Sequence, residues 1–154
     1  MRQREHTDME IRKAKLNDLQ YLTPLFDGYR QWYGQEAALE AAGQFLEERL
    51  LNGESVIFIA YVEGIGAGFT QLYPLFSSVT MERLWLLNDL YVDKKFRRMS
   101  IGEGLLKAAQ VFAKETRAKG LTLETQDSNL SAQRLYDSTG FKKEEGVYHY
   151  FWKA

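Results

Sequence analysis

The feature that most constrains the fold is an apolar run, Leu84–Val92, followed by a basic loop and a long amphipathic helix. Apolar residues occupy both alternating faces of this run, which is typical of a central strand covered on both sides. Beyond the loop, apolar residues recur at helical spacing from Ile101 to Lys119. The pattern predicts a mixed α/β sheet with helices on both faces.

The flanking segments supply the other elements of this sheet. We expect a short strand near Ile11, a helix capped by Asn17 or Asp18, and a second helix over 36–51. Later in the chain we expect a hairpin of two strands, Val56–Val62 and Gly66–Tyr73. After the central helix we expect a strand over Leu121–Thr125, a helix over Ser131–Thr139 and two closing strands that end near Trp152. Residues 9–154 are predicted to form a single domain after a flexible N-terminus, residues 1–8.

Composition excludes several classes of function. The 154 residues carry a formal net charge of −1 and no cysteine, so disulfides and thiolate chemistry are excluded and a strongly basic nucleic-acid surface is not expected. His6 and His149 are too isolated to suggest a metal site. No apolar run is long enough to span a bilayer, and the first residues lack the apolar centre of a secretory signal. We therefore expect a cytoplasmic protein without nucleic-acid or membrane partners.

The first segment with chemical potential is the start of the long helix. Arg97 and Arg98 precede Ser100-Ile101-Gly102-Glu103-Gly104. A helix N-terminus presents unpaired N–H groups and suits a pyrophosphate, and the glycines allow close approach. The alternative is an ordinary capping box, in which Ser100 caps the helix and Glu103 reaches back. The segment alone leaves both interpretations open.

The second segment is Asn129–Phe141. On a helix, Asn129, Ala132 and Tyr136 share one face, and the small residue between an amide and a phenol leaves room for a ligand. The alternative is that Asn129 is a simple N-cap and Tyr136 a packing residue.

Together, the two segments resemble the GNAT superfamily of acetyltransferases. The first is similar to its pyrophosphate motif, Arg/Gln-x-x-Gly-x-Gly/Ala, and the second to its Asn-x-x-Ala-x-x-Leu-Tyr-x-x-x-Gly-Phe motif. Ser100 departs from the family pattern, which has glycine there; if the position needs a positive φ, serine costs about 1 kcal/mol or more. Leu87–Val92 and Gln71–Pro74 further resemble the polyamine, thialysine and yeast histone/D-amino-acid branch.

The resemblance implies acetyl-CoA as co-substrate, no metal, and a splayed pair of central strands that leaves a slot for the cofactor. The implied cofactor-binding residues are Leu90, Tyr91, Val92, Arg97, Arg98, Met99, Ser100, Ile101, Gly102, Glu103, Asn129, Ala132 and Tyr136.

The implied reaction is aminolysis of the thioester. Tyr136 would protonate the leaving thiolate, and a carboxylate would take the proton of the amine. Related polyamine enzymes have Glu where this chain has Asn88, whose amide cannot act as a base. The neighbouring Asp89 is therefore the first candidate for the base, and Glu124 on the adjacent strand is the second. The acceptor would contact Asn88, Tyr33, Tyr73 and Trp85, within a wider aromatic set that includes Tyr29, Trp32, Tyr148 and Tyr150; the alternative is that most of these rings are core or dimer interface.

Three functions stay open at this stage. The first is acetylation of a small-molecule primary amine such as a polyamine or an amino acid. The second is acetylation of a protein lysine or N-terminus, and the third is a non-catalytic acyl-CoA-binding module. The resemblance also implies a homodimer.

Overall fold

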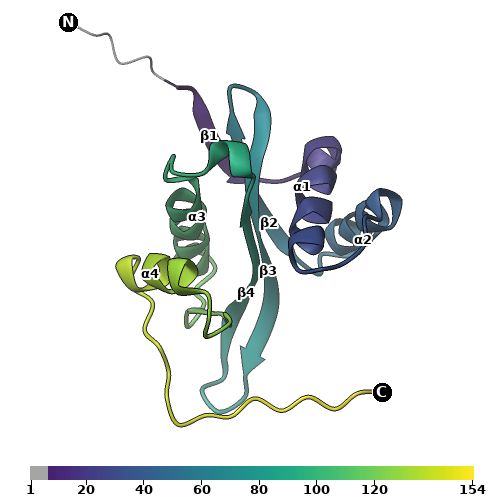
Figure 1. The fold of residues 1–154 in the computed structure, drawn as a ribbon. Helices are drawn as coiled ribbons and strands as arrows, with labels where there is room; N and C mark the ends of the chain where they lie inside the picture. The colour runs from purple at the N-terminus through teal and green to yellow at the C-terminus, as the bar shows by residue number, and fades with distance from the viewer. Residues whose placement is uncertain (1–6) are drawn as a thin grey trace, which may run out of the picture. The chain divides into compact units, whose positions relative to one another are not determined.

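The computed structural model describes residues 7–154 and contains a five-stranded sheet (Figure 1). The strands lie in sequence order; β1 to β4 are antiparallel neighbours, and β5 runs parallel to β4. The predicted α/β fold with a mostly antiparallel sheet is therefore confirmed. The elements are β1 (Met9–Lys13), η1 (Leu16–Asp18), α1 (Leu19–Trp32), α2 (Leu39–Leu51), β2 (Val56–Val62), β3 (Ile65–Ser77), β4 (Glu82–Val92), η2 (Lys94–Phe96), α3 (Ile101–Glu115), β5 (Leu121–Thr122) and α4 (Leu130–Ser138).

The chain forms two compact units. The first extends to Glu124 and contains the sheet with α1, α2 and α3; the second begins at Thr125 and contains α4. The flexible N-terminus expected over residues 1–8 lies largely outside the described residues.

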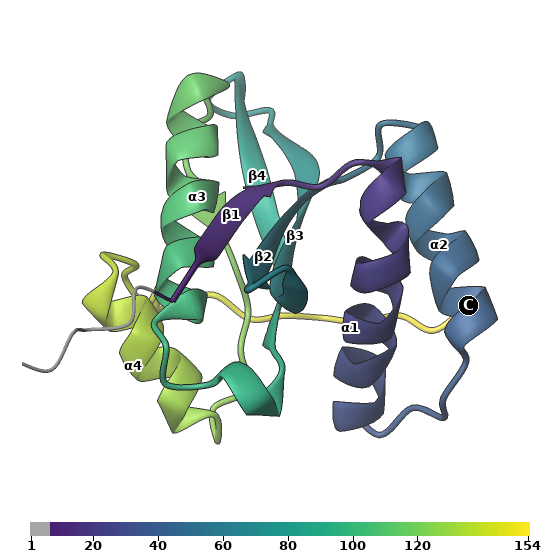
Figure 2. The same ribbon diagram turned by 90° about the horizontal axis from the view of Figure 1, so that it is seen from above.

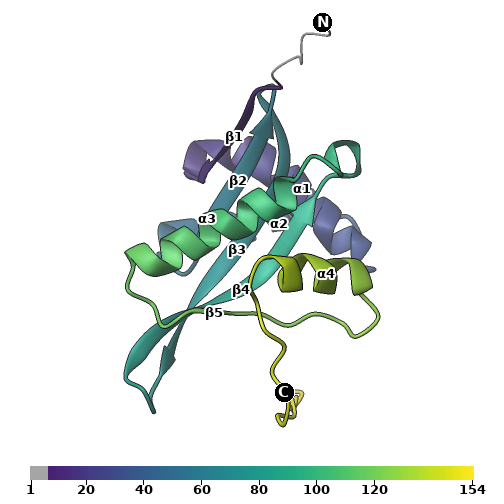
Figure 3. The ribbon, with the colours of Figure 1, turned by 90° about the vertical axis from the view of Figure 1, so that its left-hand side faces the viewer.

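Apolar side chains cover both faces of the sheet in the first unit. On one face, Leu22 and Phe26 of α1 belong to a buried cluster with Ile59 and Phe69 of the sheet. On the other face, Phe112 of α3 packs edge-on against Phe58 and lies 5.0 Å, centroid to centroid, from Trp85. Figure 2 shows α1 and α2 on one side of the strands and α3 on the other, and Figure 3 shows α3 crossing the sheet. The predicted arrangement of helices on both faces is confirmed.

The sheet opens between β4 and β5. Only Trp85 and Leu86 of β4 pair with β5, although β4 continues to Val92. In the part of the chain that the structure describes, β4 beyond Leu86 pairs with β3 alone. This is the splayed strand pair that the resemblance implies, and it leaves backbone N–H and C=O groups of β4 without a neighbouring strand.

A β-bulge reorients the end of β4. In the pairing with β3, Gln71 lies opposite Asp89 and Leu72 opposite Leu87, so Asn88 is an extra residue on β4. A regular strand would place Trp85 and Asp89 on the same face. The extra residue reverses this alternation, and Asp89 faces α1, whereas Trp85 faces α3.

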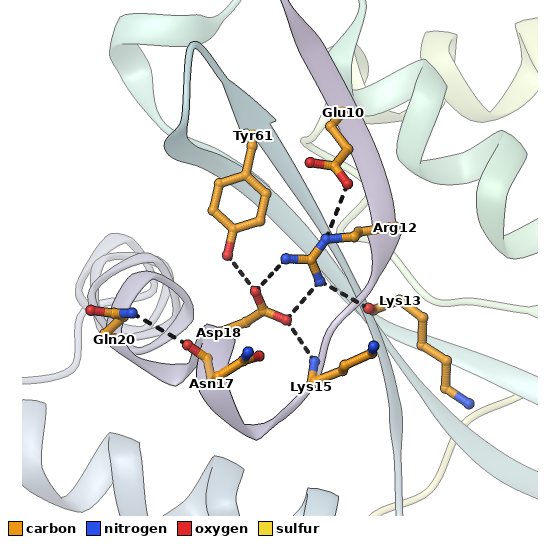
Figure 4. Close-up of polar contacts among 8 residues, drawn as sticks. All are labelled: Glu10, Arg12, Lys13, Lys15, Asn17, Asp18, Gln20 and Tyr61. Carbon is orange, nitrogen blue, oxygen red and sulfur yellow. Dashed lines mark hydrogen bonds and ion pairs between the residues drawn. The ribbon is translucent and has the colours of Figure 1, made fainter.

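An ion pair between Arg12 and the buried carboxylate of Asp18 ties β1 to the start of α1 (Figure 4). Asp18 accepts hydrogen bonds from both terminal nitrogens of Arg12, at 2.7 and 2.8 Å, and from the Tyr61 hydroxyl at 2.6 Å. The backbone N–H of Lys15 adds a fourth bond at 2.7 Å. Because the Asp18 carboxylate is 3% exposed and fully engaged, it has a structural role.

The second unit differs most from the sequence prediction. Residues 142–154 form neither helix nor strand, so the two predicted closing strands are wrong. Within residues 7–154 these β-prone residues pair with no strand, and five apolar side chains are largely exposed: Val147, Tyr148, Tyr150, Phe151 and Trp152. Two boundaries are also corrected: α3 ends at Glu115 rather than Lys119, and β5 has two residues rather than five.

Candidate active site

Asp89 is a buried carboxylate held by neutral donors. Its side chain is 4% exposed and accepts a hydrogen bond from Gln71 Nε2 at 2.7 Å and one from Asn88 Nδ2 at 3.0 Å. The Tyr29 hydroxyl of α1 is a third hydrogen-bond partner. Within residues 7–154, no ion pair includes Asp89. A buried anion without a counter-ion is costly, which is typical of functional sites.

The surroundings of Asp89 favour a carboxyl group that exchanges protons. Burial raises the pKa of Asp89, and the hydrogen bonds from Gln71, Tyr29 and Asn88 only partly oppose this rise. Burial and the nearby Asp89 also raise the pKa of Tyr29, and they raise the pKa of Tyr73 to about 12. The two phenols therefore stay neutral at physiological pH, and Asp89 is the group able to act as a base.

The start of α3 has the geometry of an anion site. Ser100 adopts a left-handed conformation with φ 61° and ψ 22°, and its side chain does not cap the helix. Glu103 instead forms an ion pair with Lys107, at 3.0 Å. The capping-box alternative is therefore wrong, and Ser100 leaves the backbone N–H groups of the first turn uncapped.

The residues of the loop fit a CoA pyrophosphate. Arg97, Arg98, Met99 and Ser100 are exposed, and Arg97 Nε donates to the backbone oxygen of Val92 at 3.3 Å, which fixes the loop against the end of β4. Uncapped helical N–H groups and exposed guanidinium groups together form an anion-binding donor set. Ile101 is different, because its side chain is 1% exposed and only its backbone can face a ligand.

The free edge of β4 fits the pantetheine arm. Leu90, Tyr91 and Val92 pair with β3 on one side and have no strand on the other. The Tyr91 ring packs against Tyr29 and Phe69, so its backbone rather than its side chain is available. Gly68 lets the two strands approach closely here, since a Cβ would lie 2.7 Å from the Tyr91 oxygen.

The structure separates the predicted acceptor residues into two groups. Tyr73 interacts with Gln71, and Tyr33 packs on Tyr29, so both lie beside the surroundings of Asp89. Trp85 does not belong there. It is buried against Phe112, and its Nε1 donates to Thr116 Oγ1 at 2.9 Å, so it is a core residue on the α3 side.

Glu124 follows β5 by two residues and is exposed. Its carboxylate lacks the burial that distinguishes Asp89. Asp89, by contrast, is buried, and this burial raises the pKa of its carboxyl group.

In the second unit, Asn129 caps α4, because its side chain accepts a hydrogen bond from the Ala132 N–H at 3.2 Å. Tyr136 packs edge-on against Phe141, with ring centroids 5.8 Å apart. The N-cap interpretation of Asn129 is confirmed. The predicted ligand contacts of Asn129, Ala132 and Tyr136 stay predictions.

A pocket of about 350 Å³ lies beside the Arg12–Asp18 ion pair. It is not the candidate active site, since the buried carboxylate there is fully hydrogen-bonded (Figure 4) and Arg12 holds its pKa well below the usual range. The sequence does not predict that Gln71 donates a hydrogen bond to Asp89. The only signal for this residue is its place in the Gln71–Pro74 segment.

Comparison with known proteins agrees with the predicted family and with the fold. The model of the acetyltransferase (GNAT) family matches residues 19–141. The uncharacterized N-acetyltransferase YhfO of Bacillus subtilis (strain 168) is 46% identical over 142 residues, which is 92% of this chain and 95% of that protein. A crystal structure of a probable acetyltransferase superimposes with a TM-score of 0.89 at 39% identity, covering 94% and 97% of the two chains.

A more distant structure shares the fold. The aminoglycoside N-acetyltransferase AAC(6')-Iy in complex with CoA has a TM-score of 0.81 at 22% identity, covering 98% and 99% of the two chains.

The chain belongs to the acetyltransferase (GNAT) family. It is an acetyl-CoA-dependent N-acetyltransferase, as the sequence predicts. No helix within residues 7–154 is long and apolar enough to cross a membrane.

Proposed function

We propose that this enzyme acetylates a primary amine of a small molecule and that Asp89 is the general base. The observation that carries the proposal is the buried Asp89 carboxylate, whose hydrogen-bond partners are all neutral. The ammonium group of an acceptor would supply the missing counter-ion, and the tyrosine rings beside Asp89 would attract the same cation.

The proposed step removes two protons from the acceptor nitrogen and gives one to the thiolate. Asp89 takes the first proton from the ammonium nitrogen. The neutral amine then attacks, a C–N bond forms at the acetyl carbonyl carbon, the C–S bond breaks, and the second nitrogen proton passes to solvent. Tyr136 donates its hydroxyl proton to the CoA thiolate, and solvent restores both side chains. At neutral pH a free alkyl amine, pKa about 10.4, is almost fully protonated, so a base beside the acceptor is required.

Two features of the first unit would hold the donor. Arg97 to Glu103 would bind the pyrophosphate, and Leu90 to Val92 would bind the pantetheine arm through their backbone. The pantetheine contacts that the motif implies for Asn129 and Ala132 stay predictions. We place Asn88, Tyr33 and Tyr73 at the acceptor and assign Glu124 no role in the step.

A small-molecule acceptor is favoured by one comparison, since the CoA complex with the same fold is an aminoglycoside N-acetyltransferase. Polyamines stay among the proposed acceptors, because the resemblance to the polyamine branch of the family is still a prediction. Acetylation of a protein lysine or N-terminus is the second candidate and is an outcome of the same experiment.

The test is release of free thiol from acetyl-CoA across a panel of amines. The panel contains polyamines, lysine analogues, both stereoisomers of several amino acids, aminoglycosides and basic peptides. The protein has no cysteine and adds no thiol signal. Release that depends on small amines supports the proposal. Release with peptides alone contradicts it in favour of a protein acceptor.

We further propose a homodimer, supported by the exposed apolar side chains of residues 147–152. Sedimentation velocity of the full chain should give the mass of a dimer, and a Tyr150→Ser/Trp152→Ser variant with unchanged circular dichroism should dissociate. A monomeric full chain at micromolar concentration would refute this state. The cytoplasmic location stays a prediction.

A further inference from the structure

Gln71 has one satisfied and one unsatisfied polar atom beside Asp89. Its side chain is 0% exposed, and its Nε2 donates to Asp89 Oδ2 at 2.7 Å. Its Oε1 is equally buried and has no hydrogen-bond partner in the part of the chain that the structure describes. Buried polar atoms are almost always paired, so this oxygen calls for a physical explanation.

The explanation lies in the chemistry of the two groups. An ionised carboxylate only accepts hydrogen bonds, and the amide nitrogen satisfies it. A protonated carboxyl group also has a donor, which needs an acceptor. A half-turn of the Gln71 amide about its last side-chain bond exchanges nitrogen for oxygen and supplies that acceptor. One residue can therefore satisfy Asp89 before and after proton transfer, which neither a carboxylate nor an ammonium side chain could do.

We infer that Gln71 is the positioning residue of the general base: its Nε2 holds ionised Asp89, and its Oε1 accepts the O–H of Asp89 once the acceptor amine has given up its proton. This inference rests on the proposed role of Asp89. The unpaired oxygen then belongs to the resting state and gains its partner during the reaction. The bulge at Asn88 serves the same purpose, because it places Asp89 opposite Gln71 in the strand register.

The Tyr29 hydroxyl and the Asn88 amide also contact Asp89 and can each donate or accept, but among the described residues around Asp89 it is Gln71 whose acceptor atom is buried and unpaired. Tyr29 lies on α1 and Tyr33 directly follows that helix, whereas Tyr73 comes from β3 and Asn88 from β4. Arg49 of α2 acts on Tyr73, whose hydroxyl also interacts with the Gln71 amide. Burial keeps the Tyr29 and Tyr73 phenols neutral, since it raises the pKa of each. Asp89 is therefore the carboxyl group whose titration Gln71 controls.

The test compares pH profiles of kcat/KM for two substitutions of adjacent buried residues. Gln71→Met keeps the size of the side chain and removes both polar atoms. Because the charged form of Asp89 loses a donor, the acid limb should move to higher pH by about one unit or more. On the plateau, kcat should fall at least about 10-fold, because protonated Asp89 loses its acceptor.

Thr70→Val is the matched control. Thr70 is also 0% exposed, but its Oγ1 donates to the backbone oxygen of Asp89, at 2.8 Å, and not to the carboxylate. This variant should leave the midpoint of the acid limb unchanged even if it lowers the melting temperature. Equal shifts in both variants would overturn the inference, because a merely structural role moves both alike.

Asp89→Asn separates the two proposals. If it leaves the acid limb intact, the proposed base is wrong. If it removes the limb while Gln71→Met leaves the midpoint in place, the base stands and the role of Gln71 is wrong. Should Gln71→Met fail to fold, the side-chain 1H–15N signals of Gln71 in the unaltered enzyme replace it. They should titrate with the midpoint of the acid limb, and pH-independent signals would overturn the inference.

Discussion

Trp85 and Asp89 lie on the same strand at positions of equal parity, yet they face opposite sides of the sheet. Trp85 packs against Phe112 of α3, and Asp89 is hydrogen-bonded on the side of α1. The extra residue Asn88 between them causes the reversal. Without it, the carboxylate would point into the apolar layer under α3, where no acceptor amine could be bound.

Replacing this carboxylate should stop proton removal and spare binding of the donor. We expect Asp89→Asn to lower kcat/KM for the amine roughly 10²- to 10⁴-fold at neutral pH, because an amide cannot accept the proton. The dissociation constant of acetyl-CoA, measured by calorimetry, should stay within about twofold, since it is fixed by other contacts. Glu124→Gln is the control and should retain most activity. A reversed order of the two losses would make Glu124 the base.

The same substitution should change the pH dependence of stability. The folded-state pKa of Asp89 is raised, so between its unfolded value, about 3.9, and that raised value the native state binds more protons and stability falls as pH rises. The Asp89→Asn variant does not lose stability in this way, because its amide does not titrate. Melting temperatures measured from about pH 4 to about pH 7 should therefore shift increasingly in favour of the variant. Parallel curves would show that burial of Asp89 carries no such cost.

Ser100 allows the strain at the helix start to be measured. Because φ is 61° there, Ser100→Gly should raise the free energy of unfolding by about 1 kcal/mol, determined in urea. Ser100→Ala keeps the strain and should give no such gain, because the hydroxyl does not cap α3. If Ser100→Ala instead weakens acetyl-CoA binding, the hydroxyl contacts the phosphate.

Tyr136→Phe tests the predicted acid. We expect a roughly 10²-fold or larger loss of kcat, because the phenol no longer protonates the thiolate. The edge-on contact with Phe141 is kept by a phenylalanine ring, so circular dichroism and melting temperature should be nearly unchanged. Full turnover in this variant would remove Tyr136 from the mechanism.

The Arg12–Asp18 ion pair should carry stability and not catalysis. Asp18→Asn should destabilise the fold by roughly 2–4 kcal/mol, because the amide replaces one of the two buried acceptor oxygens by a donor and removes the counter-charge of Arg12. Glu10→Gln, which removes the exposed partner of Arg12, should cost less than about 0.5 kcal/mol. Urea unfolding measures both. Hydrogen bonds from Arg12 hold the pKa of Asp18 below its unfolded value, so its contribution should be present at neutral pH and be lost on acidification through that lowered pKa.

The sequence predicted the elements with strong periodicity and missed what depends on pairing. The strand Val56–Val62 and the helix that begins at Ile101 have their apolar periodicity within the segment itself, and the structure contains both elements. The bulge at Asn88 and the contact between Gln71 and Asp89 depend on register between strands, which composition does not encode. The prediction of closing strands is wrong for the same reason. High β-propensity shows that residues 147–152 are able to pair, but it does not provide a partner strand.

The short β5 has a thermodynamic consequence. Along β4 beyond Leu86, a ligand that bonds to the free backbone groups would act as the missing neighbouring strand, so binding and completion of the sheet become one equilibrium. The resistance of this edge to hydrogen exchange would then follow the concentration of acetyl-CoA. In a cell, the lifetime of the enzyme against proteolysis would rise and fall with the metabolic supply of its own acetyl donor.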